Sequence, residues 1–223
     1  MASAWVVSLL AGLVGAAFAA TVAAQYARAH RPYQLAWAAG LAAYAGAALL
    51  EAAGVGIGWT PLLYRLYFPL AAGTVGLLGL GTVLLVLPRR VALGSTLLVL
   101  ALIAIAALAP LAQPLPDALP PDVGAKAVPF PNPGRFAFLV LNVAGGLALI
   151  VGALWSWWTT RRAGVLLIGV GAMAPFLGGT LSTLSAFDLR ALLQFIGIAV
   201  MFAGYLQGRE SRPSEPARDA AEA

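Results

Sequence analysis

Residues 147–173, LALIVGALWSWWTTRRAGVLLIGVGAM, decide the fold, because in them two apolar runs flank a pair of arginines. Both runs continue beyond the quoted stretch without the polar/apolar alternation of a barrel strand. About 20 apolar residues suffice to cross the hydrocarbon core as a helix, which satisfies its own backbone hydrogen bonds. The stretch therefore predicts two membrane-crossing helices joined by a short basic loop.

The composition of the whole chain agrees with a membrane protein. The 223 residues are 61% hydrophobic and only 9% charged, whereas a soluble domain carries roughly a quarter charged residues. The chain has no Cys and a single His, His30, so it cannot form a disulfide, a thiolate metal site or a multi-His metal centre by itself. We therefore expect no cofactor and no metal.

Seven segments are long and apolar enough to span a bilayer. They are residues 4–26, 33–57, 61–87, 91–112, 135–158, 163–185 and 189–207. The first segment has no Lys or Arg before it and is longer than the core of a signal peptide, so it counts as a span. The prediction is an all-α polytopic bundle of seven transmembrane helices over residues 1–207. A polar, disordered tail follows over residues 208–223.

The positions of the arginines predict the orientation of the bundle. Nine of the 13 basic residues follow the first, third, fifth and seventh segments: Arg28, Arg31, Arg89, Arg90, Arg161, Arg162, Arg209, Arg212 and Arg218. Cytoplasmic loops carry such an excess, so the N-terminus is expected outside and the C-terminus inside. The net charge of +5 then needs no nucleic-acid partner. The expected location is the bacterial inner membrane.

The tryptophans are expected at the two membrane interfaces. Trp155, Trp157 and Trp158 precede an arginine pair, which is typical of an aromatic belt at headgroup level. Trp5 and Trp59 are predicted to serve the same purpose at the outer face.

Two further features concern the packing of the helices and the outer surface. Small residues, among them Gly76, Gly79 and Gly145, predict close helix–helix packing in lipid. Residues 113–134 hold seven of the 15 prolines and are expected to be extended. This outer segment is either a simple connector or a lid over the outer mouth of the bundle.

Four charged residues lie within the predicted spans, Arg135 and Arg190 at the ends of their segments and Glu51 and Arg65 deeper. A charge inside the membrane costs a few kcal/mol unless it has a partner or a role. Glu51 lies seven residues from the outer end of its segment, and Arg65 lies one turn into the next one. Their depths agree to within about 5 Å at 1.5 Å per residue. We therefore predict an ion pair between Glu51 and Arg65.

Other polar residues at similar depth complete a predicted outward-facing pocket. Its residues are Glu51, Tyr64, Arg65, Tyr67, Arg135, Asn142, Thr180, Thr183, Arg190 and Gln194. Three arginines against Glu51 and Asp188 leave a positive surplus, which favours a small ligand with an anionic or amphiphilic character. The same residues also fit a purely architectural network, or a proton relay.

The inner half of the predicted helices is almost entirely apolar, which disfavours a path across the membrane. The sole lysine, Lys126, lies in the outer loop, so a retinal pigment with a lysine in its last helix is excluded. No HExxH, GxSxG or aspartate-rich motif occurs, and the chain is not expected to be an enzyme.

The first 80 residues carry a weak resemblance. Arg28-Ala29-His30-Arg31-Pro32, then Trp37, Glu51 and Tyr64-Arg65-Leu66-Tyr67, resemble the start of uncharacterised seven-helix proteins of high-GC bacteria. More loosely, they are similar to the seven-helix sensor modules of some bacterial histidine kinases. That resemblance implies an input role, for which this chain would need a partner protein because it carries no kinase.

Three hypotheses for function follow. The first is a receptor-like or sensor-like membrane protein that holds its ligand in the outward pocket. The second is a small-solute transporter with Pro69 and Pro175 as hinges. The third is a structural subunit, built on a protein partner or on a homo-oligomer, whose polar cluster is architectural.

Overall fold

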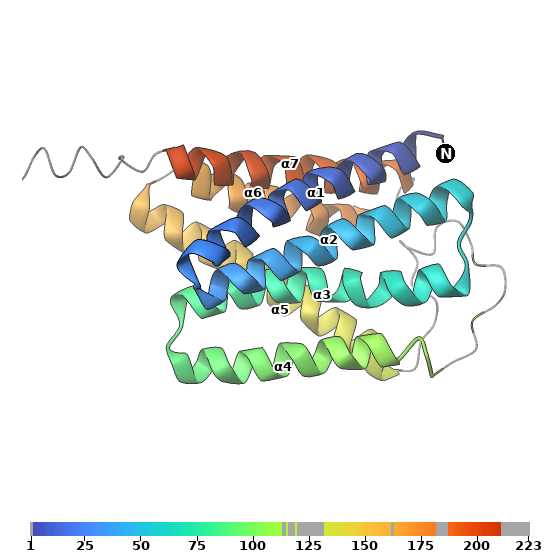
Figure 1. The fold of residues 1–223 in the computed structure, drawn as a ribbon, viewed down its shortest axis with the longest axis horizontal. Helices are drawn as coiled ribbons and strands as arrows, with labels where there is room; N and C mark the ends of the chain where they lie inside the picture. Colours follow the sequence, from blue (N-terminus) through green and yellow to red (C-terminus); the bar gives the residue numbers. More distant parts are fainter. Residues whose placement is uncertain are drawn as a thin grey trace, which may run out of the picture.

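The structure is a computed structural model that describes residues 2–112, 115, 119, 132–161, 163–181 and 187–210. Seven α-helices make up nearly all of this part of the chain (Figure 1). They are α1 (Ala2–Ala29), α2 (Pro32–Ile57), α3 (Pro61–Val86), α4 (Arg89–Leu108), α5 (Asn132–Thr160), α6 (Ala163–Leu181) and α7 (Phe187–Glu210).

The all-α prediction is confirmed, and the membrane character is supported by six of the helices. Within the described residues, α1 to α5 and α7 are long and apolar enough to cross a bilayer. For α6, the residues whose side chains the structure describes form the apolar stretch Ala163–Ala174. The structure therefore supports a multi-pass membrane protein with six candidate spans.

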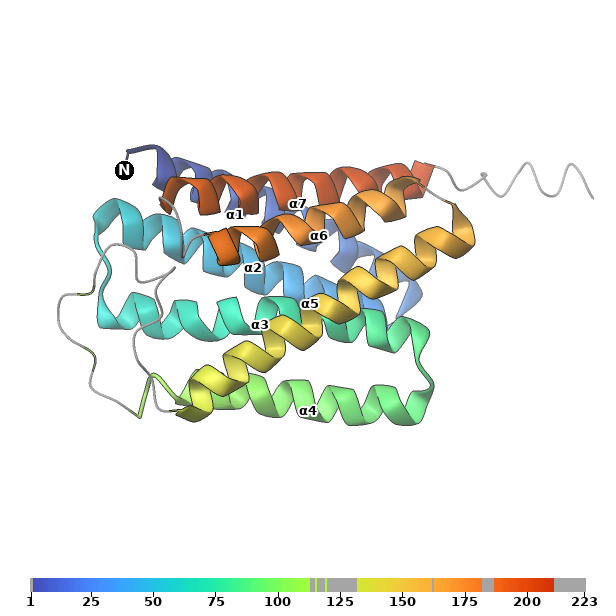
Figure 2. The ribbon, with the colours of Figure 1, turned by 180° about the vertical axis from the view of Figure 1, so that it is seen from behind.

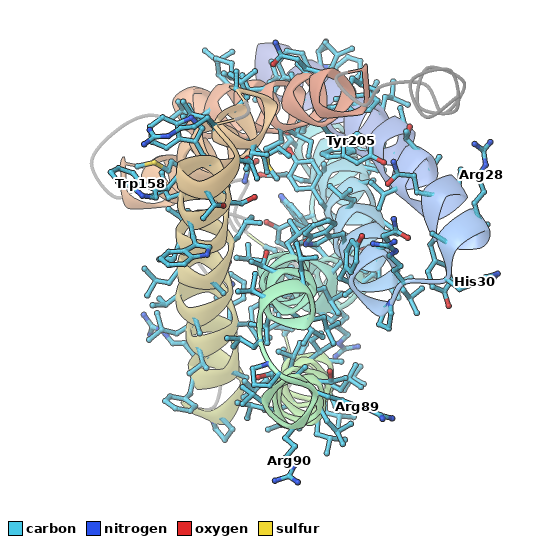
Figure 3. All side chains as sticks on the ribbon, turned by 90° about the vertical axis from the view of Figure 1, so that its left-hand side faces the viewer. Arg28, His30, Arg89, Arg90, Trp158 and Tyr205 are labelled. Carbon is cyan, nitrogen blue, oxygen red and sulfur yellow. The ribbon has the colours of Figure 1, made fainter. Side chains whose placement is uncertain are left out.

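Consecutive helices run antiparallel, and six of them close into a ring (Figures 1 and 2). Around this ring α1 packs on α2, α2 on α3, α3 on α5, α5 on α6, α6 on α7, and α7 returns to α1. Within the described helices, α4 packs against α3 and α5 and so lies outside the ring. Figure 3, a view along the bundle, shows α4 at its edge.

One end of the bundle is basic. The chain reversals from α1 to α2, α3 to α4 and α5 to α6 all lie there, at the left of Figure 1, and their described arginines are exposed. Figure 3 looks onto this basic end and shows Arg28, Arg89 and Arg90 at its rim. Trp158 is exposed on another side of the bundle, at the end of α5, and the Arg161 guanidinium lies 4.7 Å from its ring centroid. We call the opposite end, which holds the N-terminus, the distal end.

Proline and a threonine cap set where two helices begin. Pro32 and Pro61 occupy the first turns of α2 and α3, where a missing backbone N–H costs nothing. The Thr60 hydroxyl accepts a hydrogen bond from the Leu63 N–H at 3.2 Å. Between the two helices Gly58 has a φ of 99°, which few other residues adopt, and the chain reverses there.

Several helix ends differ from the sequence prediction. The helix α4 ends at Leu108 rather than at residue 112, and a turn follows in which the Leu111 N–H donates to the Leu108 carbonyl. Pro110, which has no N–H to continue the helix, lies in that turn. The helix α7 continues to Glu210, beyond the predicted end at residue 207, and residues 211–223 lie outside the described residues. Pro69 and Pro175 lie within continuous helices.

Glycines bring the helix backbones into direct contact at two crossings. At the crossing of α3 and α5, a Cβ on Gly79 would lie 2.5 Å from the Gly145 backbone, and one on Gly145 would meet the Val75 carbonyl oxygen. Between α6 and α7, a Cβ on Gly164 would lie 2.5 Å from the Gly204 carbonyl oxygen. Such contacts leave no room for a side chain and are typical of helices that associate in lipid.

The interior has two apolar clusters, one towards each end. The distal cluster draws residues from α2, α3, α4 and α5 and is rich in aromatic rings, with Phe68 stacked on Phe138 at a centroid distance of 5.3 Å. The basic-end cluster joins α1, α2, α3, α5 and α7 around Phe18 and Leu41. Phe18 stacks on Phe202 at 4.9 Å, which ties α1 to α7.

The glycine crossing gives a direct test of the packing. Gly145→Ala should lower the stability of the bundle by about 1–3 kcal/mol, because the added methyl must push α5 away from α3. Gly94→Ala in α4, where no atom lies within 4 Å of the new methyl, is the matched control and should be neutral or stabilising. Thermal unfolding of both variants in the same detergent measures the difference. Equal melting temperatures would contradict a tight α3–α5 contact.

Candidate functional site

An aromatic cluster of Trp59, Tyr64, Tyr67 and Phe68 occupies the distal end of the bundle. Trp59 belongs to the turn between α2 and α3, and the other three residues lie on the first two turns of α3. The Trp59 ring lies 5.2 Å from that of Tyr67 and 6.3 Å from that of Tyr64, edge to face in both cases. Tyr64 is the most deeply buried, with 1% of its surface exposed. Edge-to-face pairs at these distances hold the rings in fixed relative positions.

The predicted place of Trp59 at the lipid interface is wrong. Its side chain is 95% buried, because the ring folds back over Gly54 of α2, where even a methyl group would collide with it. Trp5, by contrast, is 41% exposed near the same end, as a belt residue is. The burial leaves the Trp59 Nε1–H without an acceptor in the structure. An unmade hydrogen bond of this kind costs about 1–3 kcal/mol.

Glu51 lies on the face of α2 that meets the aromatic cluster. Ala47, four residues before it, is part of the distal apolar cluster, and Gly54, three residues after it, is covered by Trp59. Residues at this spacing share one face of a helix. Glu51 is only 3% exposed and is engaged with a neighbouring group. A carboxyl group is therefore held inside the bundle next to the rings.

The predicted ion pair between Glu51 and Arg65 is not formed. Among the described residues no salt bridge links the two, and the Arg65 Nε–H donates instead to the Pro110 carbonyl at 3.2 Å. Pro110 is fully buried in the turn after α4, whereas Arg65 is half-buried. Helical depth alone made the pairing plausible, but Arg65 lies on the side of α3 that faces the end of α4. Its role in the structure is to hold the chain where it leaves α4.

Two described leucines beyond that turn contact the distal apolar cluster. Leu119 is buried in the distal apolar cluster, and Leu115 packs against it. The rest of the segment from 113 to 131 lies outside the described residues. The two leucines nevertheless show that this proline-rich connection lies on the cluster at two points, as a cover does.

The other predicted site residues do not gather around the cluster. Arg135 is exposed at the start of α5, and the Asn142 Nδ2 donates to the Phe138 carbonyl of its own helix at 2.9 Å. Gln194 is half-buried in α7, and its backbone carbonyl accepts the Tyr44 hydroxyl at 3.1 Å. The side chains of Thr180, Thr183 and Arg190 lie outside the described residues.

Towards the basic end several polar side chains donate hydrogen bonds to backbone carbonyls. The Trp37 Nε1–H donates to the Leu78 carbonyl at 3.1 Å, and Trp37 covers Gly81 of α3. Thr74 and Thr82 bond to carbonyls one turn earlier in α3. Such bonds join helices or satisfy hydroxyl groups, and the surrounding basic-end cluster is apolar.

Two hollows of the structure are not lined by the rings of the aromatic cluster. One, of ≈ 360 Å³, is a groove along the basic end of α1, bounded by Thr21, Gln25 and Arg28. The other, of ≈ 130 Å³, is an apolar crevice between α3, α4 and α5. Within the aromatic cluster itself, the Trp59 N–H is a buried polar group without a hydrogen-bond partner.

No protein-family model, no curated protein and no solved structure matches this chain. The resemblance of the first 80 residues to seven-helix sensor modules therefore stays a prediction.

A double-mutant cycle tests the roles of Glu51 and Arg65. Arg65→Leu should destabilise the protein by about 0.5–1.5 kcal/mol through loss of the bond to Pro110. The effects of Glu51→Gln and Arg65→Leu should add to within about 0.5 kcal/mol, as for residues without a shared contact. Arg65→Lys, which keeps a donor, serves as the control. Thermal unfolding of the four cycle variants measures the coupling free energy between the two residues. A double variant that is more stable than either single variant would support the predicted ion pair.

Proposed function

We propose that this chain is a receptor-like protein of the bacterial inner membrane that binds a small amphiphilic ligand at its distal end. The ligand contacts the aromatic cluster beneath the segment that carries Leu115 and Leu119. The observation that carries the proposal is the buried Trp59 N–H, a hydrogen-bond donor enclosed by rings and left without an acceptor.

In this proposal all seven helices cross the bilayer. The helix α6 has 19 residues and is therefore about 28 Å long at 1.5 Å per residue. It packs against α7, which is itself a candidate span. A length of about 30 Å covers the hydrocarbon core. The exposed arginines of the basic end then lie in the cytoplasm, and the aromatic cluster lies on the outer side.

The chemistry of the cluster favours a ligand with an apolar body and an acceptor head. Four buried rings offer an apolar contact surface, and the Trp59 N–H requires an oxygen acceptor. A carboxylate accepts such a bond more strongly than a neutral group does. Because the Glu51 carboxyl group is itself buried nearby, the ligand's headgroup must be small enough to avoid contact with it.

Access depends on the segment after α4. The Arg65–Pro110 hydrogen bond holds the start of that segment. Leu119, further along it, is buried in the distal apolar cluster. Both contacts are weak enough to open, since one hydrogen bond contributes about 1 kcal/mol and one leucine about 2 kcal/mol. Opening at this end exposes the cluster to the outer side.

Transport is less well supported than binding. The basic-end cluster fills the bundle between α1, α2, α3, α5 and α7 with apolar side chains such as Phe18, Leu41 and Met201. A transported polar solute needs polar partners along its path. A site open to one side suits a receptor, and its output in the cytoplasm then requires a partner protein or a second copy of the chain.

Single cysteines test the orientation, because the chain has none of its own. Ile57→Cys at the distal end, where the side chain is 85% exposed, should react with a membrane-impermeant maleimide in intact cells. Ala29→Cys at the basic end should react only after the cells are permeabilised. The reverse pattern would place the distal end in the cytoplasm.

Decanoate and decyltrimethylammonium, which share a chain and differ in the head, test the ligand chemistry. With 5-fluorotryptophan in the protein and the protein in lipid nanodiscs, decanoate should shift the ¹⁹F signal of Trp59 saturably. The cationic amphiphile, which has no acceptor, should leave that signal unchanged. Trp59→Phe assigns the signal, and it should weaken decanoate binding about 10-fold or more, since a hydrogen bond to a charged group is worth about 1.5–3 kcal/mol.

The control for that experiment is Trp5→Phe, which removes an exposed indole near the same end. Its binding of decanoate should equal that of the wild type. Unchanged binding in Trp59→Phe, or equal shifts with both amphiphiles, would reject the site and leave the cluster as a packing element.

A further inference from the structure

The reversal between α5 and α6 carries an arginine that two tryptophan rings hold in place. The Arg161 guanidinium lies 4.7 Å from the centroid of the Trp158 ring and 5.4 Å from that of Trp157. Among the arginines whose side chains the structure describes, Arg161 is the one that lies over aromatic rings. A guanidinium that is already stacked on indole rings loses little freedom when its N–H groups bind a further partner.

The backbone at the end of α5 sets this arrangement. The Arg161 N–H donates to the Trp157 carbonyl at 2.7 Å, and Arg161 has a φ of 55°, a conformation that usually belongs to glycine at a helix end. His30 ends α1 in the same way, with a φ of 49° and a bond from its N–H to the Tyr26 carbonyl at 2.7 Å. The two reversals thus share a backbone conformation, and the cation held on two rings distinguishes the second one.

The charge of Arg161 is open to a partner outside the described chain. Among the described residues, the hydrogen bond that Arg161 makes comes from its backbone N–H, and its guanidinium has the two rings as neighbours. Residues 123–187 of the sequence contain no Asp or Glu, so α5, α6 and the reversal between them carry no acidic group. The Arg161 side chain is also exposed. Its N–H donors therefore face the surroundings of the bundle.

An exposed apolar face of α5 leads to this arginine. Its residues recur every three or four positions and are each between 56% and 64% exposed: Leu147, Val151, Trp155 and Trp158. Figure 3 shows Trp158 on the outer side of the bundle, away from Arg28, Arg89 and Arg90. Since α5 is a candidate span, this face contacts lipid tails in a bilayer. Arg161, just beyond the end of the helix, then lies at the level of the lipid headgroups.

We propose that Arg161 binds the phosphate of an anionic phospholipid whose acyl chain lies along this face of α5. A guanidinium group donates two parallel hydrogen bonds to the oxygens of a phosphate, and the stacked rings cover its face but leave its edge free. A headgroup with a net negative charge is favoured, because no acid of α5 or α6 neutralises Arg161. Trp157 and Trp158 are positioning residues, which act by holding the guanidinium.

The lipid site is independent of the proposed distal ligand site. It lies at the other end of the bundle, on its outer surface, and the two sites have no residue in common. Loss of lipid binding would therefore leave the distal proposal standing, and the reverse also holds.

Native mass spectrometry of the full-length protein, with equal amounts of palmitoyl-oleoyl phosphatidylglycerol and phosphatidylcholine, tests the proposal. The wild type should retain the anionic lipid preferentially. Arg161→Gln should reduce that retention about fivefold or more, the effect of one arginine near an anionic membrane surface. The matched control is Arg90→Gln, an exposed arginine on another side of the same end, which should keep the preference. An equal loss in both variants, or no loss in Arg161→Gln, overturns the proposal.

A pair of glycine variants separates lipid binding from folding. Arg161→Gly relieves the positive φ and should melt no lower than the wild type, yet it should lose the preference for the anionic lipid. His30→Gly gives the same relief at the matched reversal and should keep the preference. Loss in both glycine variants, or in neither, would contradict a site at Arg161.

Two tryptophan variants test how the guanidinium is held. Trp158→Leu should reduce retention of the anionic lipid about two- to fivefold, because a cation–π contact at an exposed site contributes about that much. Trp155→Leu changes an equally exposed ring that makes no cation–π contact with Arg161, and it should leave retention unchanged. Soluble glycerol phosphate in excess should not displace the lipid, since it has no acyl chain. Displacement would assign Arg161 to a soluble phosphate and overturn the lipid site, as would equal losses in the two tryptophan variants.

Discussion

The close approach of helix backbones at glycine is the constraint on which the architecture depends. In lipid no hydrophobic force drives helices together, so they associate where backbones touch over a large area. The contact of Gly79 with Gly145 fixes where α5 crosses α3, and that of Gly164 with Gly204 holds α6 against α7. Once these two crossings are set, the ring from α1 to α7 can close through the α1–α7 and α5–α6 contacts. A side chain at either crossing would force the two helices apart and loosen their neighbouring contacts, such as the stack of Phe68 on Phe138 between α3 and α5.

The distal cluster and the apolar crevice follow from that arrangement. Because α5 crosses α3 at an angle, α4 is left outside the ring and the crevice lies between α3, α4 and α5. At the distal end the same crossing brings Phe138 onto Phe68 and completes the aromatic cluster. Two polar interior groups lie near this cluster, Glu51 on α2 and Trp59 in the reversal between α2 and α3. The distal cluster and the crevice share Leu102 and Leu141, so one arrangement of α3, α4 and α5 shapes both.

Hydropathy and charge were enough to predict the seven helices and the gathering of arginines at one end, because both depend on local composition. The ion pair of Glu51 with Arg65 was not predictable in the same way. Equal depth in the membrane says nothing about which side of α3 a residue faces, and Arg65 faces Pro110. The prediction for Trp59 was wrong for a related reason, because a tryptophan at the end of a span is typical of the aromatic belt at the membrane interface. The signal available was Gly54, whose missing side chain admits the ring, with Gly58 allowing the chain to fold back.

The burial of the Trp59 N–H separates the architectural interpretation of the distal cluster from the functional one. A cluster that only held α2 to α3 would be served as well by phenylalanine, which fills the same space without an unmade hydrogen bond. Elsewhere in the described helices, Trp37 donates to the Leu78 carbonyl and Tyr44 to the Gln194 carbonyl, whereas the buried Ser8 hydroxyl and Gln34 Oε1 have no hydrogen-bond partner, as the Trp59 N–H has none. In our proposal a ligand supplies the acceptor that the Trp59 N–H lacks, near the buried Glu51.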